Sequence, residues 1–238
     1  MTRWLTLPLG ARRIRAAPAG LAPNRELDPA GHTASTRDRR VTAGDPRDFR
    51  TRQRSVREEA ILTVAAELVA KAGYDAMRTD EVAARVGISK RTLYDHFPSK
   101  ELLVVRVVTS GMEKVLDAMD AVDPSLSAID RLTAALTIAV RRRLSLWGWG
   151  QPLPRATLEQ HEDYVRLRRQ AGAKIGTWLD QGKREGSIVR DVPTPLLVRL
   201  LMQWFSADLG GVAQMTRMRE EDVADAIVRV MLGGVRRD

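Results

Sequence analysis

Residues 90–96 read Lys-Arg-Thr-Leu-Tyr-Asp-His and bring together side chains that are suited to contact a polyanion. Lysine and arginine bind phosphate oxygens, and cationic, hydroxyl and aromatic groups also meet base edges in a major groove. If the segment is helical, Leu93 points into a core and the outer face carries the remaining side chains: Lys90, Arg91, Thr92, Tyr94, Asp95 and His96. The chemistry that these residue types favour is recognition of nucleic acid.

One short helix is predicted just before this segment, and a second is predicted over the segment itself. Thr79 is a candidate N-cap for a helix over residues 80–86. Gly87 then permits the positive φ that a sharp turn needs, and Ser89 is a candidate N-cap for a second helix over residues 90–97. Two short helices joined by a glycine-containing turn form a helix-turn-helix. The same pattern also fits a helical hairpin inside an ordinary all-α domain.

Apolar residues at helical spacing supply a surface on which the two short helices can pack. A preceding helix is predicted over residues 56–72, because Ile61, Ala65 and Leu68 fall on one of its faces. Gly73 is expected to end that helix. The helix pair is expected to bury these side chains against it: Val82, Ala83, Val86, Ile88, Leu93 and Phe97.

The remainder of the chain also reads as amphipathic helices. Apolar residues recur at three- and four-residue spacing, and we find no alternating run of strand length. The six prolines after residue 54 all fall where a helical pattern breaks. Further helices are predicted over residues 99–120, 125–147, 155–185, 194–213 and 220–235, and Ser99 is a candidate N-cap of the first of them. An all-α fold follows.

The 238-residue chain has no cysteine and three histidines that are far apart in sequence. These counts exclude disulfides, thiolate metal sites and cysteine nucleophiles, and they speak against a His-ligated metal centre. The sequence also lacks a nucleophile–base pair and a glycine-rich phosphate loop, so we expect no enzyme, no cofactor and no metal. No apolar run approaches the roughly 18 residues of a membrane span, and we expect a cytoplasmic protein that does not contact membranes.

Positive charge is concentrated at the start of the chain. The whole chain has 39 Lys and Arg against 30 Asp and Glu, a net charge of +9, and residues 1–54 account for +7 of it. This segment is rich in arginine, proline and glycine and cannot bury enough apolar surface to offset its ordering entropy, so we expect it to be disordered. Three alternatives are a transit peptide, an upstream start codon wrongly chosen for the reading frame, and an arm that touches DNA phosphates.

The string from Thr79 to Leu103 resembles the DNA-binding domain of the TetR family of transcriptional regulators. The matching residues are Thr79, Val82-Ala83, Val86-Gly87-Ile88-Ser89, Thr92-Leu93-Tyr94, His96-Phe97 and Ser99-Lys100-Glu101-x-Leu103. Upstream, Ile61-Leu62, Ala65-Ala66-x-Leu68 and Gly73-Tyr74 fit the family's first helix. The likeness implies an N-terminal three-helix helix-turn-helix domain over residues 55–103. It also implies a C-terminal helical ligand-binding and dimerisation domain over residues 104–238.

The resemblance implies eight DNA-binding residues. They are Thr79, Ser89, Lys90, Arg91, Thr92, Tyr94, His96 and Lys100. Lys90, Arg91 and Thr92 would lie nearest the bases, at the start of the recognition helix. Tyr94 and His96 would contact the DNA backbone or a thymine methyl group, and Lys100 would hold a phosphate.

The resemblance also implies that the last two predicted helices form a four-helix bundle with a second copy of the chain. The candidate interface residues are Leu197, Leu200, Leu201, Trp204, Phe205, Val223, Ile227 and Val230. The alternative is that these apolar residues belong to the core of a monomer. A two-fold homodimer would bind a palindromic operator on double-stranded DNA.

A pocket for a small-molecule effector is expected among residues 99–185. Its candidate lining residues are Met112, Leu116, Met119, Leu136, Val140, Trp147, Trp149, His161, Tyr164 and Trp178. Pockets of this kind are mostly apolar, so we expect a hydrophobic or aromatic effector. Most of these residues, taken singly, fit a core as well as a pocket. The run Arg141-Arg142-Arg143 is interpreted as a solvated helix face.

The predicted function is repression that a ligand relieves. The unliganded dimer would block transcription at its operator, and a ligand that prefers another spacing of the two DNA-binding domains would weaken DNA binding. The sequence leaves open an activator or a ligand-independent repressor of the same family. A more remote alternative is a helical adaptor that binds protein instead of DNA.

Overall fold

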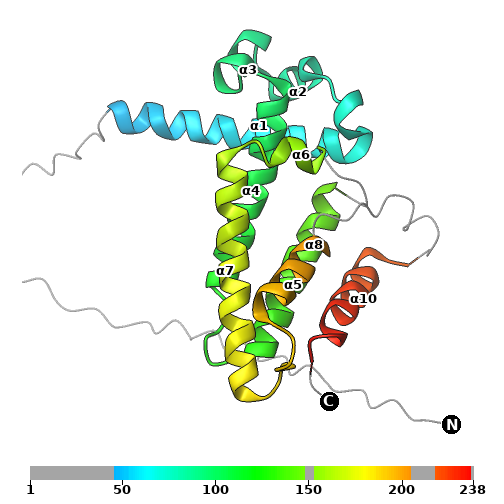
Figure 1. The fold of residues 1–238 in the computed structure, drawn as a ribbon. Coiled ribbons are helices and arrows are strands. Elements are labelled where there is room, and N and C mark those ends of the chain that lie inside the picture. Colours follow the sequence, from blue (N-terminus) through cyan, green and yellow to red (C-terminus); the bar gives the residue numbers. More distant parts are fainter. Residues whose placement is uncertain (1–45, 148–152, 205–217, 237–238) are drawn as a thin grey trace, which may run out of the picture. The chain divides into compact units, whose positions relative to one another are not determined.

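The computed structural model describes residues 46–147, 153–204 and 218–236. Within these ranges the secondary structure is helical, and extended backbone pairs at an isolated antiparallel bridge between Ile188 and Arg236. The prediction of an all-α fold is therefore confirmed (Figure 1). In the same ranges, no helix is long and apolar enough to cross a membrane, and no group of three His, Asp or Glu residues could hold a metal ion.

The first three helices form the helix-turn-helix domain. They are α1 (Pro46–Ala76), α2 (Thr79–Val86) and α3 (Lys90–His96). Their buried side chains form a first apolar cluster, in which Ile61, Val82 and Leu93 are at most 1% exposed. The predicted packing of the short helices against α1 is confirmed, with Val86 and Ile88 as half-buried members.

α1 begins at Pro46, ten residues before the helix that the sequence predicts over residues 56–72. The expectation that residues 1–54 are disordered is therefore wrong from Pro46 onward, where the chain is helical. Residues 1–45 lie outside the described part of the chain. Extending a helix that is already nucleated costs little, and proline is well tolerated in a first helical turn. The side chains of residues 51–57 are exposed, so propagation, not packing, accounts for this extension.

α4 (Lys100–Asp120) connects the helix-turn-helix domain to the remaining helices. Ser99 caps it as predicted, by accepting a hydrogen bond from the Leu102 N–H at 3.0 Å. Near the start of α4, Leu103 belongs to the first apolar cluster, and near its end Leu116 belongs to a second one. One continuous helix therefore takes part in both cores.

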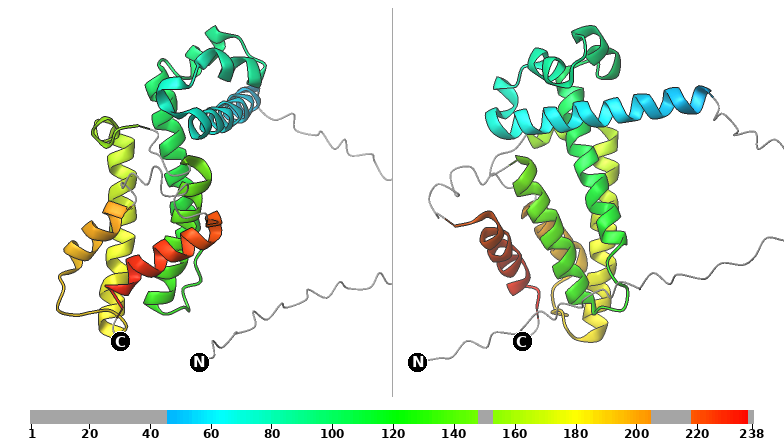
Figure 2. Two further views of the ribbon diagram at one scale, coloured as in Figure 1. Left: turned by 90° about the vertical axis from the view of Figure 1, so that its right-hand side faces the viewer. Right: turned by 180° about the vertical axis from the view of Figure 1, so that it is seen from behind.

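The helices after α4 build the second apolar cluster. They are α5 (Ala128–Trp147), α6 (Arg155–Leu158), α7 (Glu162–Glu185), α8 (Thr194–Trp204) and α10 (Glu220–Gly233). α7 packs against α4, α5 and α8, and α10 packs against α5. α4 and α7 run side by side away from the helix-turn-helix domain, and α5 runs back towards it (Figures 1 and 2).

The predicted helix over residues 155–185 is wrong, because the chain breaks it into α6 and α7. Leu158, at the end of α6, is 5% exposed and belongs to the first apolar cluster, so this short helix packs into the core that also buries side chains of α1, α2 and α3. α7 then starts afresh after His161, with Glu162 and Asp163 in its first turn. Acidic side chains there are favourable for the helix dipole.

The other helix predictions in this region are confirmed within the described ranges. α5 begins three residues later than the predicted 125–147, and α10 ends two residues before the predicted 220–235. The prediction over residues 194–213 is confirmed as far as Trp204, and the rest of it lies outside the described residues.

Candidate nucleic-acid interface and ligand pocket

The turn between α2 and α3 has the predicted geometry. Gly87 has φ 76°, in the left-handed region, and the Ile88 N–H donates to the Ala83 carbonyl at 3.0 Å. Ser89 caps α3 by accepting a hydrogen bond from the Thr92 N–H at 3.0 Å. These local bonds fix where α3 begins and which of its faces turns outward.

Thr79 does not cap α2. Arg78 occupies the N-cap position with extended backbone, at φ −107° and ψ 125°, and Thr79 is the first residue of the helix. The prediction of a Thr79 N-cap is therefore wrong by one residue. The Thr79 hydroxyl lies 3.2 Å from the Tyr94 hydroxyl, and this contact joins α2 to the outer face of α3.

The outer face of α3 presents most of the predicted charged and aromatic side chains. Lys90, Arg91 and Asp95 are exposed, and Tyr94 is 37% exposed. Lys90 Nζ lies 2.7 Å from a carboxylate oxygen of Asp80 on α2. This hydrogen-bonded ion pair lowers the pKa of Asp80 and raises the pKa of Lys90. The first cation of α3 is thus already paired within the protein.

Sequence reasoning missed one cation on this surface. Arg78 is exposed, and its charge adds slightly to the lowering of the Asp80 pKa and slightly opposes the rise in the Lys90 pKa. It therefore adds positive charge where α2 meets the start of α3. A basic residue directly before a predicted helix-turn-helix is the sequence signal that identifies it.

Two of the predicted DNA contacts turn towards α1 instead. His96 is half-buried, its Nδ1 has no hydrogen-bond partner within the described ranges, and its charged neighbours include Arg54 and Glu58 of α1. Burial, followed by the charge of Arg54, lowers the pKa of His96. Lys100 Nζ donates to the backbone carbonyl of Asp75 at 3.1 Å. The structure therefore does not place His96 on the outer face of α3, and the predicted phosphate contact of Lys100, in α4, stays a prediction.

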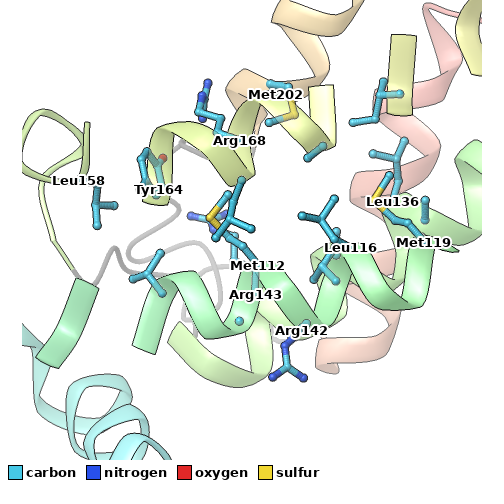
Figure 3. Close-up of a pocket in the computed structure, with 18 of the residues that line it drawn as sticks. Met112, Leu116, Met119, Leu136, Arg142, Arg143, Leu158, Tyr164, Arg168 and Met202 are labelled. Carbon is cyan, nitrogen blue, oxygen red and sulfur yellow. The ribbon is translucent and has the colours of Figure 1, made fainter. Parts of the chain in front are cut away.

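A pocket of about 170 Å³ lies between α4, α5 and α7, and residues of α6 and α8 complete its lining (Figure 3). Its walls are mainly aliphatic. Half of the predicted pocket residues line it: Met112, Leu116, Met119, Leu136 and Tyr164. Enclosure by apolar side chains with a few polar groups is typical of sites for small ligands.

Three of the other predicted pocket residues, Val140, His161 and Trp178, do not line it. Val140 and Trp178 are buried in the second apolar cluster, because their faces of α5 and α7 pack between helices. His161 lies 3.2 Å from a carboxylate at the start of α4. Trp149 lies outside the described residues, and so does the side chain of Trp147.

The pocket also contains charges that the sequence interpretation missed. Four arginines are part of the lining: Arg142, Arg143, Arg155 and Arg168. Of the predicted solvated run, Arg141 is exposed and pairs with Asp225 at 3.1 Å, whereas Arg142 and Arg143 contribute to the pocket lining. The signal was present, because Arg143 lies seven residues after Leu136, on the same helical face.

The predicted dimer residues divide into a buried and an exposed set. The buried ones are Leu197, Leu201 and Val223, and because they lie in the chain's own core, their assignment to a dimer interface is corrected. The exposed ones are Leu200, Trp204 and Val230, at 54%, 39% and 63%. Ile227 is half-buried, and Phe205 lies outside the described residues. Leu196, 47% exposed, extends the exposed set along α8.

Known proteins resemble this chain in sequence and in fold. The family described as "Bacterial regulatory proteins, tetR family" matches residues 61–107, from the middle of α1 into α4. The HTH-type transcriptional activator FasR of Mycolicibacterium smegmatis is 32% identical over 106 residues, which cover 44% of this chain and 48% of FasR. The chain thus matches about half the length of FasR. The HTH-type transcriptional repressor KstR2 of the same organism is 24% identical over 198 residues, 77% of this chain and 92% of KstR2.

A solved structure extends the likeness to the fold beyond the helix-turn-helix domain. The transcriptional regulator FadR from Bacillus subtilis, in complex with stearoyl-CoA, superposes with a TM-score of 0.58 at 15% identity. The superposition covers 75% of this chain and 99% of that one. The matching sequence over residues 61–107 assigns the helix-turn-helix domain to the TetR family of bacterial regulatory proteins, and the shared helix layout extends the likeness in fold to the remaining helices.

Proposed function

We propose that this protein is a homodimeric, cytoplasmic transcriptional repressor that an effector in the pocket releases from its operator. The choice of repressor over activator is supported by the longer alignment. KstR2, named as a repressor, aligns over 77% of this chain, whereas the activator FasR aligns over 44%.

DNA is bound through the outer face of α3 and the start of α2. Lys90, Arg91 and Arg78 supply cations there, and the exposed Tyr94 adds a ring and a hydroxyl. Residues 55–238 carry a net charge of only +2, so the bulk charge of the folded part does not favour DNA. The local set of side chains does, because it combines phosphate-binding cations with groups that can read base edges.

The observation that carries the regulatory part is that the pocket and the first apolar cluster, in which α1, α2 and α3 are packed, share side chains. Leu158, Tyr164 and Val108 line the pocket and are also buried in the first apolar cluster. A ligand in the pocket therefore contacts residues that support α1, α2 and α3. It changes DNA affinity only to the extent that it binds one arrangement of these residues better than the other.

A second copy of the chain covers an apolar strip on α8 and α10. We define the apolar strip as Leu196, Leu200, Trp204 and Val230, all of which are at least 39% exposed. On α8 its members recur at four-residue spacing and so form one continuous row. A two-fold dimer would place two copies of α3 about 34–36 Å apart, and the operator would be palindromic.

A binding experiment on DNA tests this proposal. DNA upstream of the protein's own gene and a pool of random duplexes are used in gel-shift selections, which should recover palindromic sequences. Arg91→Ala should weaken binding to the selected site by about tenfold, as expected for loss of one base contact. Arg166→Ala, on α7 and paired with Asp163, is the matched control. If no duplex is retarded at moderate salt, or if both variants bind like wild type, the assigned DNA surface is wrong.

A further inference from the structure

The N-terminal part of α1 carries two exposed cations, Arg54 and Arg57, which we call the arginine pair. Within the described ranges, neither of these side chains makes a hydrogen bond or an ion pair. The neighbouring acids of α1, Glu58 and Glu59, pair instead with cations of α4, at 3.8 and 3.5 Å. The arginine pair therefore keeps its positive charge available for a partner outside the chain.

The helical register places the arginine pair on the face of α1 that packs in the first apolar cluster. Ile61 and Leu68, both buried in that cluster, follow Arg54 at seven-residue spacing, and Arg57 stands four residues before Ile61. Residues at these spacings share one face of an α-helix. At its start, α1 runs past α2 and α3 (Figures 1 and 2). Two cations thus continue the core-facing row where the helix leaves the core.

Two observations place the arginine pair beside α3, the helix to which base contacts are assigned. Arg57 lines a groove together with Val86 and Ile88 of the turn that precedes α3. At the other end of α3, the charges of Arg54 and Arg57 add to the effect of burial, which is the main cause of the lowered pKa of His96. The arginine pair therefore lies near both ends of α3 and borders the surface that we assign to DNA.

The partner that fits this position is the DNA backbone. Duplex DNA carries one negative charge for about every 1.7 Å of its axis, and guanidinium groups bind phosphate oxygens with charge-assisted hydrogen bonds. A helix in the major groove has phosphates along its flanks, and phosphate contacts fix its orientation on the duplex. An acidic protein would also match the charge, but it would not require that the charge borders α3.

We propose that the N-terminal part of α1 is a second DNA-binding surface, on which Arg54 and Arg57 bind backbone phosphates beside the groove that α3 enters. This inference rests on the proposed function, and it adds contacts that are not among the eight predicted DNA-binding residues. Phosphates are alike at every base pair, so these contacts carry no sequence information. They raise the affinity for any duplex and hold α3 in register over the bases.

The salt dependence of DNA binding by the full-length protein tests the inference. The double variant Arg54→Gln and Arg57→Gln should bind the selected operator and a random duplex about tenfold more weakly than wild type at low salt. The slope of log affinity against log salt concentration should decrease by about one for each phosphate contact that is lost. The ratio of operator affinity to random-duplex affinity should stay unchanged, because the base contacts remain.

A matched double variant removes the same charge at another place. Arg169 and Arg184 are exposed on α7, and Arg169→Gln with Arg184→Gln should bind both duplexes with the wild-type salt slope. The arginine pair is exposed, so its replacement should leave the midpoint of urea denaturation unchanged, which separates a lost DNA contact from a lost fold. If the double variant does not fold, Arg57→Gln alone should lower the slope by about one.

Three outcomes overturn the inference. They are an unchanged salt slope in the double variant, which would favour an acidic protein as the partner, an equal loss of affinity in the matched double variant, and a changed ratio of operator to random-duplex affinity.

Arg91→Ala separates this inference from the proposed function. If Arg91→Ala weakens operator binding and the double variant does not, the inference alone fails. If the double variant weakens binding to random DNA but no operator can be selected, the proposed function alone fails. If the wild-type protein binds no duplex, both fail.

Discussion

Lys90 and Asp80 form an ion pair on the surface to which we assign the operator. Their side chains are 59% and 55% exposed, and ion pairs at such positions contribute little to stability. A DNA phosphate competes with Asp80 for the Lys90 ammonium, and the carboxylate itself repels the phosphate. At the scale of single residues, we therefore expect Asp80 to limit DNA affinity while contributing little to the fold.

Asp80→Asn is accordingly expected to tighten DNA binding by about two- to fivefold, the range of a weak surface pair. Fluorescence anisotropy with the selected operator at fixed salt measures this change. Asp95→Asn removes the same charge from the other end of α3 and is the matched control. An equal gain in both variants would show that net charge, and not the release of Lys90, is responsible.

His96 gives the fold a pH dependence of known sign. Burial lowers its pKa in the folded state, so the unfolded chain binds more protons as the pH falls. The free energy of unfolding should therefore decrease as the pH is lowered from about 7.5 through 6.5, the ordinary pKa of histidine, towards the folded pKa. Urea denaturation between about pH 5.5 and 7.5 avoids most carboxylate titration.

In that window His96→Gln should flatten the pH dependence of stability, because glutamine does not titrate. A second measurement, the NMR titration of the His96 ring, should give a midpoint below 6.5, the ordinary pKa of histidine. A midpoint at or above that value would contradict the burial of His96 against α1.

The turn between α2 and α3 depends on one backbone conformation. Gly87 has φ 76°, and no heavy atom lies within 4 Å of the position that a Cβ would occupy. Gly87→Ala should therefore lower the free energy of unfolding by about 1–2 kcal/mol through backbone strain alone. Gly233→Ala, also in open space but without a positive φ, should be neutral or slightly stabilising in the same urea titrations. Equal stability of the two variants would show that the turn relaxes.

The elements that sequence predicts well are those with local causes. Ser89, Gly87 and Ser99 act on residues within one helical turn, and each has its predicted role in the structure. The break between α6 and α7 has a distant cause, because Leu158 is drawn into the first apolar cluster. The helical pattern of residues 155–185 is continuous and does not indicate this break. The extension of α1 to Pro46 is likewise not visible in the local sequence, because it depends on the helix that residues 56–72 already form.

The pocket shows the same limit at the scale of the molecule. Apolar periodicity indicates the inward faces of α4, α5 and α7, and it correctly includes Leu136 and Tyr164. It does not distinguish a side chain that borders a cavity from one packed between helices, so Val140 and Trp178 were assigned to the pocket although they belong to the core. Arg143 is predicted to be solvated because charged side chains usually lie at the surface, and the sequence pattern does not show that a pocket lies beside this residue.

Dimerisation is the proposed property of the whole molecule that its surface most directly supports. Leu200 and Val230 of the apolar strip are 54% and 63% exposed, and exposed apolar rows of this kind mark association sites. Leu200→Glu adds a charge to this row without disturbing the chain's own core, so it should convert the dimer to a folded monomer in sedimentation experiments.

The monomer should also bind the full operator more weakly, by about a hundredfold, because the second half-site no longer adds its effective concentration. Leu126→Glu, which changes an equally apolar residue that is 39% exposed but lies outside the strip, is the matched control and should stay dimeric with full affinity. If the protein remains a dimer in both Leu200→Glu and Val230→Glu, the two copies must associate through another surface. In that case the spacing of the two α3 helices, and with it the length of the operator, would have to be derived from that surface instead.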